Sequence, residues 1–265
     1  MIALWINDIH LEFLDEQQLV RFLSVLRNHN ADCVLAGGDI AQAPSISHHL
    51  KKLEKVLQCP IYFVLGNHDY YHGSIAAVRS TISELEKKSE YLYWLNRTGI
   101  VRLTETITLI GHDGWGDGRL GDFQNSNIML NDFRLIEELT GLTRKALLKQ
   151  LHQLGDEGAE YFRALLPEAL RVSNHVVVLI HVPPFMEATW HEGRPSEPDW
   201  LPFFSCKVVG DVLKESMQAH THKKMTVLCG HTHGGGVSHI LPNLVCYTGP
   251  AKYGSPRVQR VFKWD

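Results

Sequence analysis

Five short apolar runs, each followed at once by residues that can bind metal, constrain this chain more than any other feature of its sequence. The runs cover residues 2–6, 33–36, 61–65, 176–180 and 225–229. Short runs rich in β-branched residues are typical of strands that are buried on both faces of a sheet. The stretches between them have the apolar periodicity of helices. This alternation predicts an α/β protein whose first half contains mainly parallel strands.

Further elements follow the same patterns. The segment 143–172 is expected to hold two helices that are separated near Gly155. Additional strands are expected at 91–95, 100–103, 106–110, 237–241, 244–247 and 258–263, the last three as a β-meander. These elements together predict two packed sheets with helices outside. No repeat, low-complexity tract or linker divides the chain, so we expect residues 1–265 to form a single domain.

Polar residues with metal-binding side chains follow each of the five runs. They are Asp8, His10, Asp39, Asn67, His68, Asp69, His181, His231 and His233. Because open α/β sheets form their sites at the carboxyl ends of strands, we expect these five segments to meet in one crevice. In extended backbone, residues i and i+2 point to the same side, so the D-x-H and H-x-H pairs can each direct two side chains into one site.

The mixture of ligand types indicates transition metals. Neutral imidazoles with carboxylate and amide oxygens suit Mn, Fe, Zn or Co, whereas thiolates would indicate structural zinc and an all-oxygen set Ca or Mg. A carboxylate between two sites can bridge ions about 3.5–4 Å apart, a spacing that suits in-line attack on phosphorus. One such pair is a weak signal, but five segments in order, each directly after a strand, are not expected by chance.

The ordered motifs D-x-H, G-D, G-N-H-D, H and G-H-x-H resemble those of the calcineurin-like metallophosphoesterase superfamily. The resemblance spans residues 8–233. It implies an α/β fold of two mixed β-sheets flanked by helices, in four layers, and a hydrolase with two divalent or trivalent transition-metal ions (Mn, Fe, Zn or a mixture). It implies that Asp39 bridges the two ions. The first ion would be held by Asp8, His10, Asp39 and His233, and the second by Asp39, Asn67, His181 and His231.

The resemblance also implies the roles of the remaining site residues. A metal-bridging hydroxide would be the nucleophile. His68 would contact the phosphoryl oxygens or protonate the leaving group, and Asp69 would orient it. The residues after Asp39 lack the D-R-G of serine/threonine phosphoprotein phosphatases, which makes that branch a poor match.

Three hypotheses of function remain open at this point. The leading one is hydrolysis of a small-molecule phosphodiester, and the alternatives are a phosphomonoesterase on the same metals and a non-catalytic scaffold with a vestigial site. The net charge of −3 and the absence of long basic runs disfavour a nucleic-acid substrate. No apolar segment approaches the ~20 residues of a membrane span. The start of the chain lacks a signal-peptide pattern, and the five cysteines form no C-x-x-C, so we expect a cytoplasmic protein with reduced thiols; its oligomeric state is not indicated.

Two long irregular segments, 111–132 and 182–205, are expected to form the substrate wall. Loops of this length in a compact domain are usually functional. Trp190 suits an organic leaving group, and Arg119 or Arg194 suits an anionic oxygen.

Overall fold

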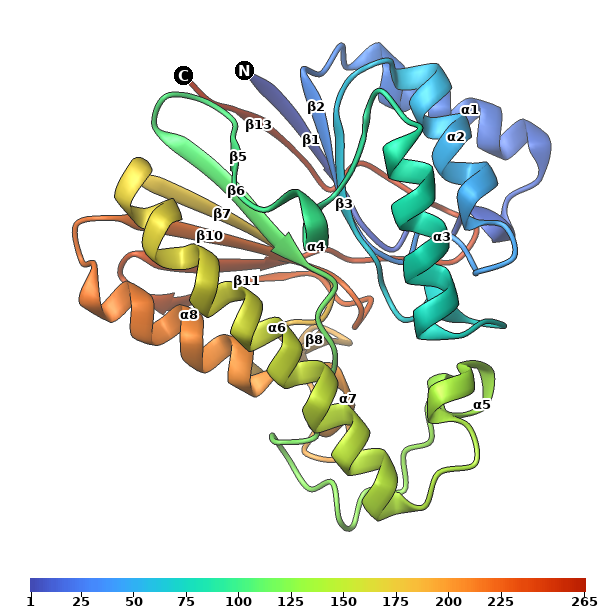
Figure 1. Cartoon of the computed structure of the whole chain (residues 1–265), viewed down its shortest axis with the longest axis vertical. Coiled ribbons are helices and arrows are strands. Elements are labelled where there is room, and N and C mark those ends of the chain that lie inside the picture. Colours follow the sequence, from blue (N-terminus) through green and yellow to red (C-terminus); the bar gives the residue numbers. More distant parts are fainter.

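The computed structural model describes all residues 1–265 and has two mixed β-sheets at its centre (Figure 1). The first sheet has the strand order β13-β1-β2-β3-β4. Strands β1 to β4 are parallel, and β13 pairs antiparallel with β1. Their bounds are β1 Ile2–Ile6, β2 Cys33–Gly37, β3 Ile61–Val64, β4 Leu92–Trp94 and β13 Arg260–Lys263.

The second sheet has the strand order β11-β12-β10-β7-β6-β5. Its four inner strands are parallel, and β5 and β11 pair antiparallel at the two edges. The bounds are β5 Val101–Arg102, β6 Ile107–His112, β7 His175–Ile180, β10 Lys224–Cys229, β11 Gly236–Leu241 and β12 Leu244–Thr248. A separate small hairpin consists of β8 (Trp190–His191) and β9 (Arg194–Pro195).

Helices cover the outer faces of both sheets (Figure 1). Helices α1 (Glu16–Asn28), α2 (Ile46–Leu57) and α3 (Ile75–Lys87) lie against the first sheet, and α6 (Arg144–Val172) and α8 (Lys207–Ala219) lie against the second. The expectation of two mixed sheets flanked by helices is therefore confirmed. Shorter turns are α4 (Leu95–Thr98), α5 (Asp132–Leu135), α7 (Leu201–Phe204), η1 (Leu11–Phe13), η2 (His68–Tyr70), η3 (Glu137–Leu139) and η4 (Met186–Ala188). No helix has both the length and the apolarity to cross a membrane.

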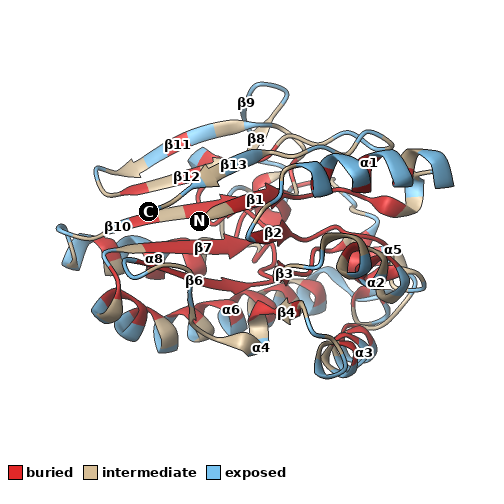
Figure 2. Cartoon of the chain, turned by 90° about the horizontal axis from the view of Figure 1, so that it is seen from above, coloured by how far each residue is buried: buried red, intermediate tan, exposed pale blue.

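The apolar runs are continuous because each central strand is buried on both faces. In β1, Leu4 and Ile6 belong to the core that also holds buried residues of α1, α2 and α3. The alternate residues Ala3 and Trp5 pack with residues of β7 and β10, between the two sheets. Figure 2 shows that buried residues concentrate in the inner strands, whereas the edge strand β11 and the outward side of α1 are largely exposed or half-buried.

Two local expectations are corrected by the structure. The segment 144–172 is one helix of 29 residues, and Gly155 lies inside it. A Cβ at Gly155 would lie 2.6 Å from the Cβ of Asp117, so this glycine permits close packing and does not break the helix. The expected three-stranded meander is not formed. Strands β11 and β12 pair with each other, but β13 pairs with β1 of the other sheet, where it covers the otherwise open edge of β1.

Candidate metal centre

The segments that follow β1, β2, β3, β7 and β10 meet at one edge of the two sheets. Backbone hydrogen bonds hold the segments together. The amide of Asp8 donates to the carbonyl of Gly38 at 3.1 Å, and the amide of Gly230 donates to the carbonyl of His181 at 2.9 Å. A Cβ at Gly230 would clash with the carboxylate of Asp8, so only glycine allows this approach. The structure thus brings together the site residues that the sequence singled out.

Five of these residues have left-handed backbone conformations. The φ angles are 47° at Asp8, 41° at His10, 49° at Asp39, 68° at His231 and 58° at His233. A non-glycine residue in this region costs of order 1–3 kcal/mol and persists only where its surroundings fix it. Such strained residues cluster at functional sites, and here they coincide with candidate ligands.

One group of candidate ligands consists of Asp8, His10, Asp39 and His233. Their ligand atoms all lie within 4.8 Å of one another. The Nε2 of His10 lies 3.2 Å from the Nε2 of His233 and 3.6 Å from Oδ2 of Asp39. The Nε2 of His233 lies 3.7 Å from Oδ1 of Asp8. These four side chains could hold one metal ion.

A second group forms around Asn67. Its Oδ1 lies 2.9 Å from Nδ1 of His231 and 3.1 Å from Nε2 of His181. The same Nε2 of His181 lies 3.4 Å from Oδ1 of Asp39. Asp39 therefore presents one oxygen to each group.

Hydrogen bonds outside the site fix which atoms face into it. The Nδ1 of His181 lies 2.9 Å from the carbonyl of Gly37, and the Nε2 of His231 lies 3.2 Å from the carbonyl of Phe203. Because a carbonyl can only accept, each of these nitrogens carries the proton, and the other ring nitrogen presents a lone pair to the site.

The amide of Asn67 is oriented in the same way. Its Nδ2 donates to Oδ1 of Asp132 at 2.8 Å and to the hydroxyl of Tyr71 at 3.2 Å, so Oδ1 faces the histidines. Three acceptor atoms, from Asn67, His181 and His231, thus converge without a proton among them. Such a set is repulsive by itself and fits a cation.

Electrostatics support the same conclusion. Asp8 and Asp39 are 2% and 1% exposed, and no Lys or Arg lines the cavity above them. Burial, and next the charge of Asp8, raise the pKa of Asp39 well above its usual value. Burial is also the main cause that lowers the pKa of His231 to about 3, so this imidazole is neutral and free to bind. Buried carboxylates without a Lys or Arg partner are costly unless a metal compensates them.

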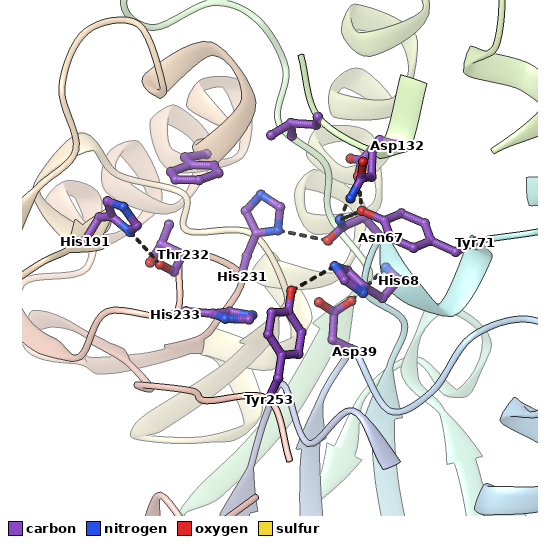
Figure 3. A pocket seen from close by; sticks show the side chains of 13 residues that line it. Asp39, Asn67, His68, Tyr71, Asp132, His191, His231, Thr232, His233 and Tyr253 are labelled. Carbon is purple, nitrogen blue, oxygen red and sulfur yellow. Dashed lines mark hydrogen bonds between the residues drawn. The ribbon is translucent and has the colours of Figure 1, made fainter. Parts of the chain in front are cut away.

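A cavity of about 230 Å³ lies over these groups (Figure 3). Its lining includes Asp39, Asn67, His68, His231 and His233 together with residues that the sequence motifs did not reveal. The latter are Tyr71, Leu130, Asn131, Asp132, His191, Phe204, Thr232 and Tyr253. Both long segments contribute, since residues 130–132 come from the first and His191 and Phe204 from the second.

Comparison with known proteins identifies the family. The model of the calcineurin-like phosphoesterase family matches residues 1–235. The chain belongs to this family. The expected resemblance is confirmed, and it makes the chain a member of a group of metal-dependent hydrolases that act on phosphate esters.

Solved structures with the same fold have low sequence identity. Phosphopantetheinyl hydrolase from Mycobacterium tuberculosis is 15% identical with a TM-score of 0.66, and the match covers 95% of this chain and 89% of that one. A dimetal phosphatase from Danio rerio is 14% identical with a TM-score of 0.59, covering 97% and 89%. A protein of Thermus thermophilus is 12% identical with a TM-score of 0.54, covering 94% and 88%. No curated protein sequence matches the chain significantly.

One implied role in this phosphoesterase needs correction. Asp69 does not contact the ring of His68, because both of its oxygens accept backbone N–H groups. Oδ1 accepts from Ile40 and Ala41 at 2.8 and 2.9 Å, and Oδ2 accepts from Gly66 at 2.7 Å. Asp69 therefore joins the loops that follow β2 and β3. His68 instead stacks on Tyr71, with ring centroids 4.2 Å apart.

The residues expected to contact the leaving group or an anionic oxygen of the substrate also lie elsewhere. Trp190 donates from Nε1 to Oγ of Ser238 at 3.0 Å. Arg194 pairs with Glu197 at 2.9 Å, and Arg119 pairs with Asp117 and Asp156. None of the three lines the cavity, because local partners hold each one away from it.

Proposed function

We propose that this chain is a binuclear metal-dependent phosphoesterase whose substrate is a small phosphodiester. The observation that carries the proposal is the arrangement of acceptor atoms around Asp39. Its two oxygens face two ligand groups, and the second group contains three converging lone-pair atoms. Two ions, each Mn, Fe or Zn, would match these donors.

Each residue has a defined task in this proposal. Asp8, His10, Asp39 and His233 would hold the first ion, and Asp39, Asn67, His181 and His231 the second. When bound, the ions would act as Lewis acids on the ester and activate water for attack on phosphorus. His68 lines the cavity without belonging to either ligand group, and its Nε2 would donate to a phosphoryl oxygen or pass a proton to the leaving group.

The charge of the cavity favours a diester over a monoester. A phosphomonoester carries up to two negative charges near neutral pH, and a phosphodiester carries one. The lining contains Asp39 and Asp132 but no Lys or Arg, so the two ions would be the main positive charges available to the substrate. A singly charged ester therefore fits this cavity with less repulsion.

Metal analysis and a paired assay test the proposal. Protein purified without chelator and reconstituted with Mn, Fe or Zn should contain about two equivalents of metal. It should hydrolyse bis-(p-nitrophenyl) phosphate faster than p-nitrophenyl phosphate. The Asp39→Ala variant, purified in the same way, should hydrolyse neither ester, which excludes a contaminating phosphatase as the source of the activity. Less than one equivalent would refute the binuclear centre, a reversed preference would indicate a phosphomonoesterase, and full metal loading without any turnover would indicate a scaffold.

A further inference from the structure

Tyr253 forms the outer layer of the cavity beside the first ligand group. Its ring lies 4.6 Å from the ring of His10 and 4.9 Å from that of His233, and Phe13 packs behind it at 5.0 Å. Tyr253 is 48% exposed, whereas His10 is fully buried. It follows β12 and lies beyond residues 1–235, so the family motifs do not include it.

The segment that carries Tyr253 is attached to the site. The amide of Ala251 donates to the carbonyl of His233 at 3.1 Å, and the amide of Gly249 donates to the carbonyl of Cys229 at 2.9 Å. Ser255 closes a turn around Tyr253 by donating to the carbonyl of Lys252 at 3.0 Å. The position of the phenol is thus tied to the loop that follows β10.

The hydroxyl of Tyr253 points toward His68 (Figure 3). It lies 3.5 Å from Nε2 of His68, at the outer limit of a hydrogen bond, and it has no other partner. A phenol is protonated near neutral pH, so it can donate to an oxygen placed in the cavity.

Several hydrogen-bond donors in this cavity are already engaged. No Lys or Arg is present, and the hydroxyl of Tyr71 already donates to Asp132 at 2.7 Å. The Nδ2 of Asn67 is likewise engaged with Asp132 and Tyr71. The hydroxyl of Tyr253 remains free and lies next to the histidine that faces the cavity.

We propose that Tyr253 contacts the substrate directly and that its hydroxyl donates a hydrogen bond to an oxygen of the phosphoryl group, beside His68. This inference rests on the proposed function and adds a residue from outside the family motifs to the site. The ring, supported by Phe13, would also shield the first ligand group from bulk water.

Replacement of Tyr253 by Phe tests the hydroxyl alone, because the ring and its packing remain. A hydrogen bond to a charged group typically contributes enough to change affinity about tenfold or more. We expect kcat/KM for bis-(p-nitrophenyl) phosphate to fall about tenfold and the Kd of inorganic phosphate, measured by calorimetry, to rise about as much. Metal content should stay at the wild-type value. Tyr93→Phe is the matched control, since Tyr93 bonds only to the carbonyl of Glu90, away from the cavity.

Two outcomes would overturn this inference. Wild-type kcat/KM and phosphate affinity in Tyr253→Phe would show that the hydroxyl does not contact the substrate. Loss of metal from Tyr253→Phe would show that the hydroxyl supports the ligand histidines instead. The metal content and turnover of the wild-type protein test the proposed function separately. Phosphate calorimetry compares the wild type with Tyr253→Phe even if neither protein hydrolyses an ester.

Discussion

The floor of the cavity and its wall are built in different ways. The floor consists of strand ends, where Asp8 and His181 are 2% and 1% exposed and several residues have strained backbone. The wall comes from residues 130–132, His191, Phe204 and Tyr253, which are distant in sequence, and Tyr253 is 48% exposed. Floor residues bond to one another and to backbone, whereas Asp132, His191 and Tyr253 of the wall come from distant segments and contact the loops after β3 and β10.

This difference separates two properties of the site. The floor would determine whether metal binds, because its side chains present the candidate ligand atoms. The wall would contact the ester and, apart from Asp132, which holds Asn67, could change without disturbing the metals. Changes in the floor should therefore affect every substrate equally, and changes in the wall should affect one substrate more than another.

The largest effect is expected for Asp39→Ala. This change removes the only carboxylate that faces both ligand groups and would leave two cations to repel each other. We expect loss of one or both metals and of nearly all turnover with diesters and monoesters alike. Metal analysis with parallel assays measures both, and wild-type activity would exclude a bridging role.

His68→Ala should have the next largest effect while leaving the metals in place. His68 lies over the floor but contributes no atom to either proposed ligand group. Loss of a positioned general acid typically lowers the rate about 10²–10⁴-fold. The loss should be smaller for a nitrophenyl ester, whose leaving group needs no proton. If metal content falls as well, His68 is itself a ligand.

The floor could be predicted residue by residue, whereas for the wall the sequence indicated the two long segments but not which of their residues line the cavity, and it missed Tyr253. Floor residues follow apolar strands at fixed spacing, so local patterns reveal them and the strand ends bring them together. Tyr253 and Asp132 belong to no such pattern, and only tertiary packing places them in the cavity. Asp69 lay in a recognised motif, yet its bonds to backbone could be seen only in the structure.

Asp132 connects wall and floor, so its replacement should have an intermediate effect. Its Oδ1 accepts from Nδ2 of Asn67 at 2.8 Å, and Asp132→Ala would leave that amide held only by the hydroxyl of Tyr71. Changes that disturb the orientation of a ligand usually lower metal affinity about 10–100-fold. Metal titration should show weaker binding of the second ion only. Asp122→Ala is the control, since Asp122 lies in the same segment but bonds to Asn125 at the surface.

The smallest effects should come from the β8–β9 hairpin, where one residue of a cross-strand pair lines the cavity and the other faces solvent. His191 lines the cavity, and its Nδ1 lies 3.1 Å from the carbonyl oxygen of Thr232. Its partner Arg194 has a side chain that is 69% exposed and pairs with Glu197. We expect His191→Ala to change the ratio of kcat/KM between a bulky and a small diester by about three- to tenfold, the effect of one or two lost contacts. Arg194→Ala should leave that ratio unchanged, and both variants should keep their metals. If Arg194→Ala shifts the ratio as far as His191→Ala does, the substrate extends past the hairpin, and the wall is wider than the cavity now indicates.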